Sequence, residues 1–128
     1  MTRQIIRTDK APSSPLYSQA VRIGSTLYVA GTAGIDVATR QLAGPTIQDQ
    51  TRQALRNCQA ILEAAGTTLA DVAQVTVLLA RPADFAGMNE EYAKVFATDP
   101  PARAVARLGV ELPDLLISIM MTAHVATT

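Results

Sequence analysis

The sequence predicts an α+β fold in which one sheet of about six strands carries two helices on one face. Apolar residues recur at helical spacing in two segments, and short apolar or β-branched runs typical of strands lie before, between and after them. The order is β-β-α-β-α-β-β, with one further short strand at the N-terminal edge. At 128 residues the chain is expected to fold as one domain over residues 1–128.

The first strands are predicted between residues 5 and 31. Residues 5–7 are expected to form a short edge strand, and residues 8–17 the loop that follows it. The runs 20–23 and 27–31 flank Gly24-Ser25-Thr26, which is typical of a tight turn between antiparallel strands. This part of the chain therefore predicts a hairpin beside an edge strand.

A long amphipathic helix is predicted after Thr46, a typical N-cap residue, with Asp49 three residues later as a weakened capping box. Gly66 is typical of the position just after a helix ends. The residues at helical spacing are Ile47, Ala54, Leu55, Cys58, Ile61, Leu62 and Ala65. Cys58 lies among them and is expected to be an inert thiol of the core.

The second helix is predicted to begin near Pro82, between a buried strand at 72–79 and a strand at 102–108. Its expected apolar face consists of Phe85, Met88, Tyr92, Val95 and Phe96. Its charged residues Glu90, Glu91 and Lys94 are expected on the solvated face.

The last predicted strand, residues 117–125, carries apolar residues on both faces. Alternate positions give one fully apolar face, and Met120 lies on the other face with Ser118, Thr122 and His124. Two helices can cover only one face of the sheet, and a largely apolar second face in water would be unusual for a monomer. We therefore expect a homo-oligomer whose sheets meet.

Composition excludes several classes of function. Eleven basic and eleven acidic side chains give zero formal charge, so nothing favours nucleic acid or an anionic membrane as a partner. No apolar run has the length of a membrane span, and the first residues lack the apolar segment of a signal peptide. One histidine and one cysteine, without ligand spacing, argue against a metal. A single cysteine also fits a reducing compartment, so we expect a cytoplasmic protein.

Arg103 is the residue that suggests a ligand. It opens a predicted strand behind Pro100 and Pro101, which make the approach to the strand stiff. A guanidinium at a fixed position offers the planar set of donors that bidentate binding of a carboxylate requires. A surface ion pair is the alternative.

Six segments in order carry a resemblance to a known family. They are residues 14–21 (Ser-Pro-Leu-Tyr-Ser-Gln-Ala-Val), 29–31 (Val-Ala-Gly), 50–57 (Gln-Thr-Arg-Gln-Ala-Leu-Arg-Asn), 61–66 (Ile-Leu-Glu-Ala-Ala-Gly), 85–92 (Phe-Ala-Gly-Met-Asn-Glu-Glu-Tyr) and 101–103 (Pro-Ala-Arg). Their succession resembles the Rid family (reactive intermediate deaminase, also called YjgF) over essentially the whole chain. No one segment is highly specific, but their order and spacing together are.

The resemblance implies a chorismate-mutase-like α+β fold assembled as a homotrimer, with ligand clefts between subunits and no cofactor. Active members hydrolyse 2-imino acids and their enamine tautomers to 2-oxo acids and ammonia. The family arginine that binds the substrate carboxylate corresponds to Arg103. The aromatic residue of the cleft corresponds to Tyr17, the asparagine of the second helix to Asn89, and the glycine of the third strand to Gly31.

The sequence departs from the family at the position that activates water. Family deaminases carry a glutamate fifteen residues after the arginine, and here that residue is Ser118. A serine accepts a proton poorly. Glu111 is one candidate replacement, because its loop is longer than the family's before Leu112-Pro113 and shorter after it, and could bring the carboxylate inward. A solvated carboxylate in a turn is the alternative for this residue. His124 is another candidate replacement, but it lies about 20 Å along the same strand and would have to reach another subunit's cleft.

Three further family positions also differ: Ala30, Val105 and Met120 stand where serine or threonine, cysteine and an acidic residue are common.

Three functions compete. An imine or enamine deaminase with Arg103 and Ser118 at its catalytic site is favoured, and a small-carboxylate-binding protein on the same scaffold is the alternative. A nuclease or translation-inhibitor role has the least support, because the chain has no basic patch and no pair of histidines. The sequence does not name the ligand or the pathway.

Overall fold

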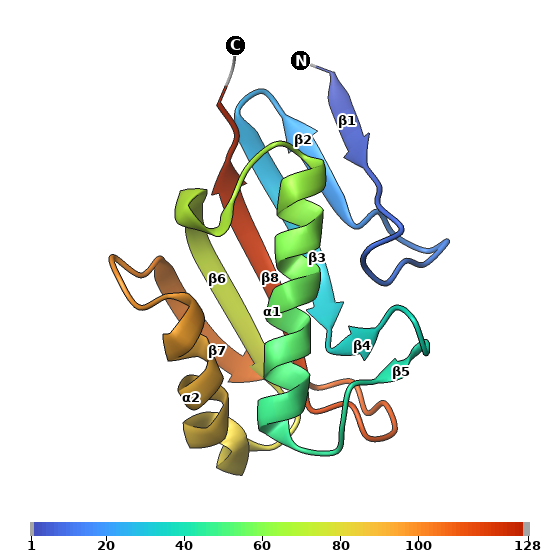
Figure 1. The fold of residues 1–128 in the computed structure, drawn as a ribbon, viewed down its shortest axis with the longest axis vertical. Helices are drawn as coiled ribbons and strands as arrows, with labels where there is room; N and C mark the ends of the chain where they lie inside the picture. The colour runs from blue at the N-terminus through green and yellow to red at the C-terminus, as the bar shows by residue number, and fades with distance from the viewer. Residues whose placement is uncertain (1, 127–128) are drawn as a thin grey trace.

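Figure 1 shows the computed structural model, which describes residues 2–126. The main elements are β1 (Arg3–Ile6), β2 (Ala20–Ile23), β3 (Thr26–Ala33), β4 (Ile35–Asp36), β5 (Gln41–Leu42), α1 (Ile47–Ala64), β6 (Val72–Leu79), α2 (Phe85–Val95), β7 (Ala102–Arg107) and β8 (Ile117–His124). Short 3₁₀ turns precede β6 (Leu69–Asp71) and α2 (Pro82–Asp84).

Six strands form one sheet in the order β1-β2-β3-β8-β6-β7, and both helices lie on one side of it (Figure 1). Neighbouring strands are antiparallel except β6 and β7, which are parallel and joined through α2. The short pair β4 and β5 stands beside this sheet. The predicted α+β architecture is confirmed.

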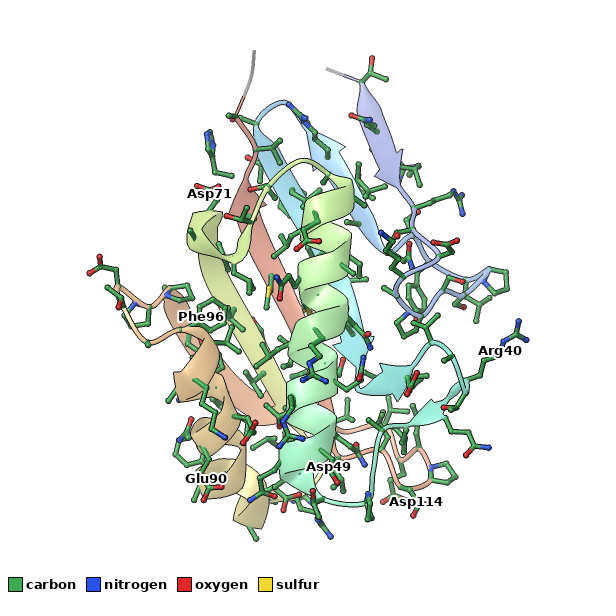
Figure 2. The ribbon with its side chains drawn as sticks, in the orientation of Figure 1. Arg40, Asp49, Asp71, Glu90, Phe96 and Asp114 are labelled. Atoms are coloured by element: carbon green, nitrogen blue, oxygen red, sulfur yellow. The ribbon has the colours of Figure 1, made fainter. Side chains whose placement is uncertain are left out.

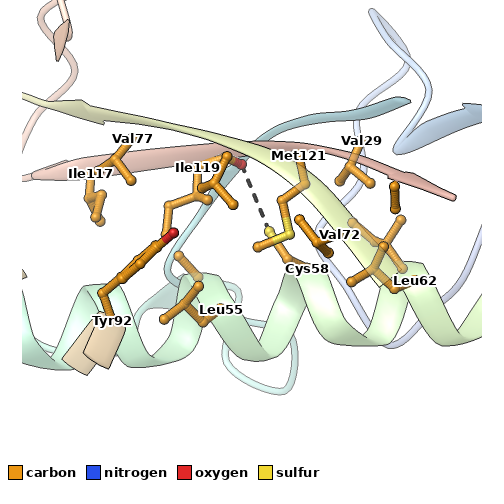
Figure 3. Close-up of a cluster of buried hydrophobic side chains, with 14 of the residues drawn as sticks. Val29, Leu55, Cys58, Leu62, Val72, Val77, Tyr92, Ile117, Ile119 and Met121 are labelled. Carbon is orange, nitrogen blue, oxygen red and sulfur yellow. Dashed lines mark hydrogen bonds between the residues drawn. The ribbon is translucent and has the colours of Figure 1, made fainter. Parts of the chain in front are cut away.

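The hydrophobic core fills the layer between α1 and the sheet (Figure 3). Leu55 and Leu62 of α1 are buried there, and so are Ile119 and Val77 of the central strands. Cys58 is fully buried in the same layer, its Sγ lies 3.8 Å from the Ile119 carbonyl oxygen, and burial raises the pKa of its thiol to about 12. The prediction of an inert core thiol is therefore confirmed.

The ends of α1 follow the predicted signals. The Thr46 hydroxyl accepts a hydrogen bond from the Asp49 backbone N–H at 3.1 Å, which satisfies one of the free donors of the first turn. Gly66 adopts a φ of +83° just after the helix ends, a conformation that glycine reaches without strain.

The second helix differs from its prediction in three residues. Met88, Tyr92 and Phe96 are buried as expected, but Phe85 and Val95 are exposed. Glu91 was predicted on the solvated face and is only 6% exposed. Its carboxylate accepts from Arg52 Nε at 2.9 Å and from Lys94 Nζ at 2.8 Å, so ion pairing across α1 and α2 replaces its hydration.

The face of the sheet away from the helices exposes apolar side chains. Alternate residues of β8 are buried under the helices, whereas Met120 on the other face is 45% exposed. Tyr28 of β3 and Ile23 of β2 are also exposed. Within residues 2–126, no helix has the length and apolar composition needed to cross a membrane.

Candidate functional site

Arg103 is positioned by α2, which crosses over β7. The Arg103 guanidinium lies 4.6 Å from the ring centre of Tyr92 and 5.8 Å from that of Phe85. Its Nη1 donates to the Asn89 side-chain oxygen at 2.7 Å. We call Arg103, Asn89, Tyr92 and Phe85 the Arg103 cluster. Aromatic faces and an amide oxygen hold the guanidinium without neutralising its charge.

No acidic side chain pairs with Arg103 in the part of the chain that the structure describes. The ion pairs there involve Arg52, Arg81 and Lys94. The Arg103 side chain is exposed, so a carboxylate from solution can reach the guanidinium donors that Asn89 does not use.

Tyr92 forms the floor under Arg103. It is 7% exposed, and its hydroxyl has no hydrogen-bond partner among the described residues. Burial raises the pKa of this phenol, and the positive charge of Arg103 opposes part of that rise. Tyr92 therefore contributes its ring to the cluster, and its hydroxyl is an unsatisfied polar group in the core.

Ser118 lines a separate cavity of about 460 Å³ together with Tyr17 and Gly31. We call it the Ser118 cavity. Gly31 lies at a register shift of β3 against β8, where a Cβ would come within 2.8 Å of the Ser118 Oγ. The absence of a side chain at Gly31 leaves the serine hydroxyl open to the cavity. Tyr17 is half exposed at its rim.

The Arg103 cluster and the Ser118 cavity lie on opposite faces of the sheet. Arg103 pairs with Val75 of β6, which is fully buried beneath the helices. Ser118 pairs with Leu78 of the same strand. Because side chains alternate along a strand, Val75 and Leu78 point to opposite faces, and so do Arg103 and Ser118. Within one chain Arg103 lies beside Asn89, and Ser118 lies beside Tyr17 and Gly31. The two groups do not meet within one chain.

Neither candidate replacement for the family glutamate reaches Ser118 within one chain. Glu111 lines a neighbouring hollow of about 350 Å³ with Leu108 and Arg107. His124 is at the opposite end of β8, paired with Thr26. Both side chains are exposed.

Sequence reasoning missed Tyr92 and Phe85 as supports of Arg103. A signal was present, because Phe85, Asn89 and Tyr92 are spaced by four and three residues and so share a helix face. What the sequence did not reveal is that β7 lies in parallel beside β6, which places Arg103 under that face. Within residues 2–126, no cluster of three histidine, cysteine or acidic residues could hold a metal.

Comparisons with known proteins agree with this architecture. The family model described as endoribonuclease L-PSP matches residues 8–125. A RutC family protein of Pyrococcus horikoshii is 44% identical over 95% of this chain and 98% of its own length. The 2-iminobutanoate/2-iminopropanoate deaminase of Rattus norvegicus is 43% identical over 80% of this chain and 75% of its own length.

The fold is likewise shared with a solved structure. The crystal structure of E. coli TdcF with bound serine has a TM-score of 0.88 to this chain at 30% identity, over 96% of this chain and 99% of the other. Likeness over this extent confirms the predicted chorismate-mutase-like α+β fold.

Proposed function

This chain belongs to the Rid family, also described as endoribonuclease L-PSP, and from that premise we propose that it is an imine deaminase acting on small 2-imino acids. The observation that carries the proposal is Arg103. Its guanidinium is held by Tyr92 and Asn89 while its charge has no acidic partner among the described residues. A fixed, uncompensated guanidinium suits the carboxylate that every 2-imino acid carries.

Relatives support this assignment of substrate class. The rat relative is named a deaminase of 2-iminobutanoate and 2-iminopropanoate, and TdcF was solved with serine, a small molecule with a carboxylate. The name endoribonuclease is not carried over, because the formal charge is zero and the single histidine lies far from the Ser118 cavity.

In the proposed reaction, Arg103 binds the carboxylate and withdraws electron density from the adjacent imine carbon. A water oxygen adds to that carbon and one of its protons passes to the imine nitrogen, which gives a carbinolamine. The second proton then passes from the oxygen to the nitrogen, the carbon–nitrogen bond breaks, and ammonia leaves as the 2-oxo acid forms. Ser118 can position the water by hydrogen bonding but is a poor proton acceptor. Loss of a general base typically costs about 10²–10⁴ in rate, so we expect a slower enzyme than glutamate-bearing relatives.

The proposed active assembly is a homotrimer with clefts between subunits. Arg103 and Ser118 face opposite sides of one sheet, so a small ligand can contact both only if they come from different copies. The exposed apolar side chains Tyr28, Met120 and Ile23 supply a surface that a second copy could cover. In this assembly Arg103 of one copy completes the Ser118 cavity of the next.

A non-catalytic small-carboxylate-binding protein is the second candidate. One observation favours it: within one chain neither Glu111 nor His124 reaches the Ser118 cavity. Such a protein would bind a small carboxylate through Arg103 and would hydrolyse no imine.

The test is hydrolysis of 2-iminobutanoate and 2-iminopropanoate generated in situ by an amino-acid oxidase, with ammonia release followed over the spontaneous rate. We expect acceleration by the parent protein and its loss in Arg103→Ala. Arg107→Ala removes an arginine from the same strand and is the matched control. If the parent binds 2-oxobutanoate but does not accelerate hydrolysis, the binding protein is the correct reading. If Arg103→Ala hydrolyses imines and binds 2-oxobutanoate as well as the parent does, Arg103 is not the carboxylate site.

A further inference from the structure

The Ser118 cavity is larger and more apolar than a one- or two-carbon side chain requires. We propose that it is a side-chain pocket that selects 2-imino acids with a bulky apolar side chain, of about the size of leucine's. This inference rests on the proposed deaminase function and names its substrate class.

The volume of the cavity supports a ligand larger than 2-iminopropanoate. At about 460 Å³ it lies within the range of roughly 300–1,000 Å³ that is usual for small-molecule sites. With the imine carbon and its attacking water beside Ser118, a methyl or ethyl side chain would fill less of the remaining space than a branched four-carbon side chain would. A branched four-carbon side chain would remove more apolar surface from water, which favours its binding.

The chemistry of the walls selects against charge. The larger apolar wall residues include Ile35, Leu42, Leu108, Val110, Leu112 and Leu115. None of the described residues that line the cavity carries a charge. Two polar wall residues are already hydrogen-bonded, since Thr32 donates to the Ala30 carbonyl at 2.8 Å and Gln19 to several carbonyls. A charged substrate side chain would therefore lose much of its hydration and find no opposite charge among these wall residues.

One wall of the cavity is fixed by Gln19. Its side-chain amide is 5% exposed, donates to the carbonyls of Thr8, Ala11 and Pro12, and accepts from the Thr8 N–H at 2.8 Å. These bonds hold the loop that leads from Pro12 to Tyr17, both of which line the cavity.

Another wall is supported by Gln50 of α1, which is fully buried. It donates to the carbonyls of Gly44 and Asp114 and accepts from the Leu116 N–H at 2.9 Å. Figure 2 places Asp114 in the loop before β8, beside the start of α1. The loop that carries Val110 to Leu115 is thus anchored at its end, so the cavity exists before a ligand arrives.

The experiment measures the affinity of the parent protein for three 2-oxo acids by calorimetry: 2-oxobutanoate, 4-methyl-2-oxopentanoate and 2-oxoglutarate. Two additional buried carbons should make 4-methyl-2-oxopentanoate bind about tenfold more tightly than 2-oxobutanoate. 2-Oxoglutarate should bind most weakly, because its second carboxylate meets an uncharged wall. Hydrolysis of the imines derived from leucine and from 2-aminobutyrate should follow the same order.

A filling variant tests the location of the pocket. Ala33 lines the cavity and pairs with Ser118 across the strands, so Ala33→Leu should shift the preference toward 2-oxobutanoate. Ala64→Leu makes the same change on the exposed side of α1 and should keep the parent's order of affinities.

Different failures separate this inference from the proposed function. If 2-oxobutanoate binds as tightly as the longer acid and small imines are hydrolysed, the pocket assignment is wrong and the deaminase stands. If no 2-oxo acid binds and no imine is hydrolysed, both are wrong. The ligand series on the parent decides this even if Ala33→Leu does not fold.

Discussion

Arg103 and Ser118 point to opposite faces of the same six-stranded sheet. Arg103 faces α2 and stacks on the Tyr92 ring, whereas Ser118 opens into a cavity beside Gly31 and Tyr17. The resemblance to the Rid family predicts that both residues belong to the ligand site. A catalytic site that uses both therefore requires two copies of the chain, and the proposed mechanism depends on that arrangement.

Restoring a carboxylate at the position of Ser118 should raise imine hydrolysis. Ser118→Glu places a general base in a cavity of about 460 Å³, so the expected gain is about 10²-fold. Partial burial would raise the pKa of the new carboxyl, and a neighbouring copy's arginine would oppose that rise. Ala64→Glu, on the exposed side of α1 and away from both the cavity and the open face of the sheet, is the control for added charge. Equal rates in both variants would show that position 118 does not contact the water.

Stability should depend on pH through Glu91. Hydrogen bonding from Lys94, with Arg52 adding to it, holds the pKa of this carboxyl below its usual value despite burial. Its stabilising contribution is therefore complete above the unfolded-state pKa of roughly 4.3 and is lost as the pH falls further. Urea unfolding measured from pH 7 to pH 3 should show this loss in the parent and less of it in Glu91→Gln.

Glu91→Gln should lower the free energy of unfolding at pH 7 by about 1–2 kcal/mol, because it removes the ion pairs with Arg52 and Lys94. The loss is modest because both partners are well exposed and water screens their charges. Glu90→Gln changes the exposed neighbour and should have a small effect at every pH. If the two variants unfold alike, the ion pairs of Glu91 do not stabilise the fold.

Tyr92 should tolerate loss of its hydroxyl but not of its ring. Its hydroxyl is buried without a partner among the described residues, so Tyr92→Phe should be neutral or stabilise by up to about 1 kcal/mol. Tyr92→Leu removes the ring that lies 4.6 Å from the Arg103 guanidinium and should weaken 2-oxobutanoate binding. Thermal unfolding and calorimetry measure the two effects. A strongly destabilised Tyr92→Phe would mean that the hydroxyl has a partner in the assembled protein.

Local signals predicted most of the fold. The β-branched run Val72–Leu79 is a strand at the predicted bounds, and Thr46 and Gly66 mark the ends of α1 as expected. In each case the residues that decide the structure are adjacent in sequence. Because only two helices were predicted, they were also expected to cover one face of the sheet, and both do lie on one side of it.

What the sequence did not reveal depends on distant partners. The two-residue strands β4 and β5 lie where Asn57 of α1 donates to the Ala33 and Ile35 carbonyls, a contact made across more than twenty residues. Glu91 is buried because Arg52 reaches it from 39 positions away. Both were missed, since local composition does not show which residue will satisfy a buried polar group.

Arg103 was predicted from its place behind Pro100 and Pro101, and the other candidate site residues were predicted from the resemblance. Their separation into two groups was not predicted. Arg103 and Ser118 are fifteen residues apart, an odd number, but a loop intervenes, so spacing alone does not decide which faces they occupy. Strand register decides it, through their pairing with Val75 and Leu78.

A mixing experiment tests the shared site most directly. Arg103→Ala lacks the carboxylate grip, and Ser118→Phe fills the cavity, so each variant alone should bind no 2-oxobutanoate. The two variants are unfolded, mixed in equal amounts and refolded together, and sedimentation should confirm that the product has the mass of a trimer. In such randomly mixed trimers about one quarter of the clefts combine an intact Arg103 with an intact cavity from the next copy. We therefore predict that the mixture recovers about a quarter of the parent's binding capacity in calorimetry. A mixture as inactive as either pure variant would contradict the account, because both groups would then serve a ligand within the same chain.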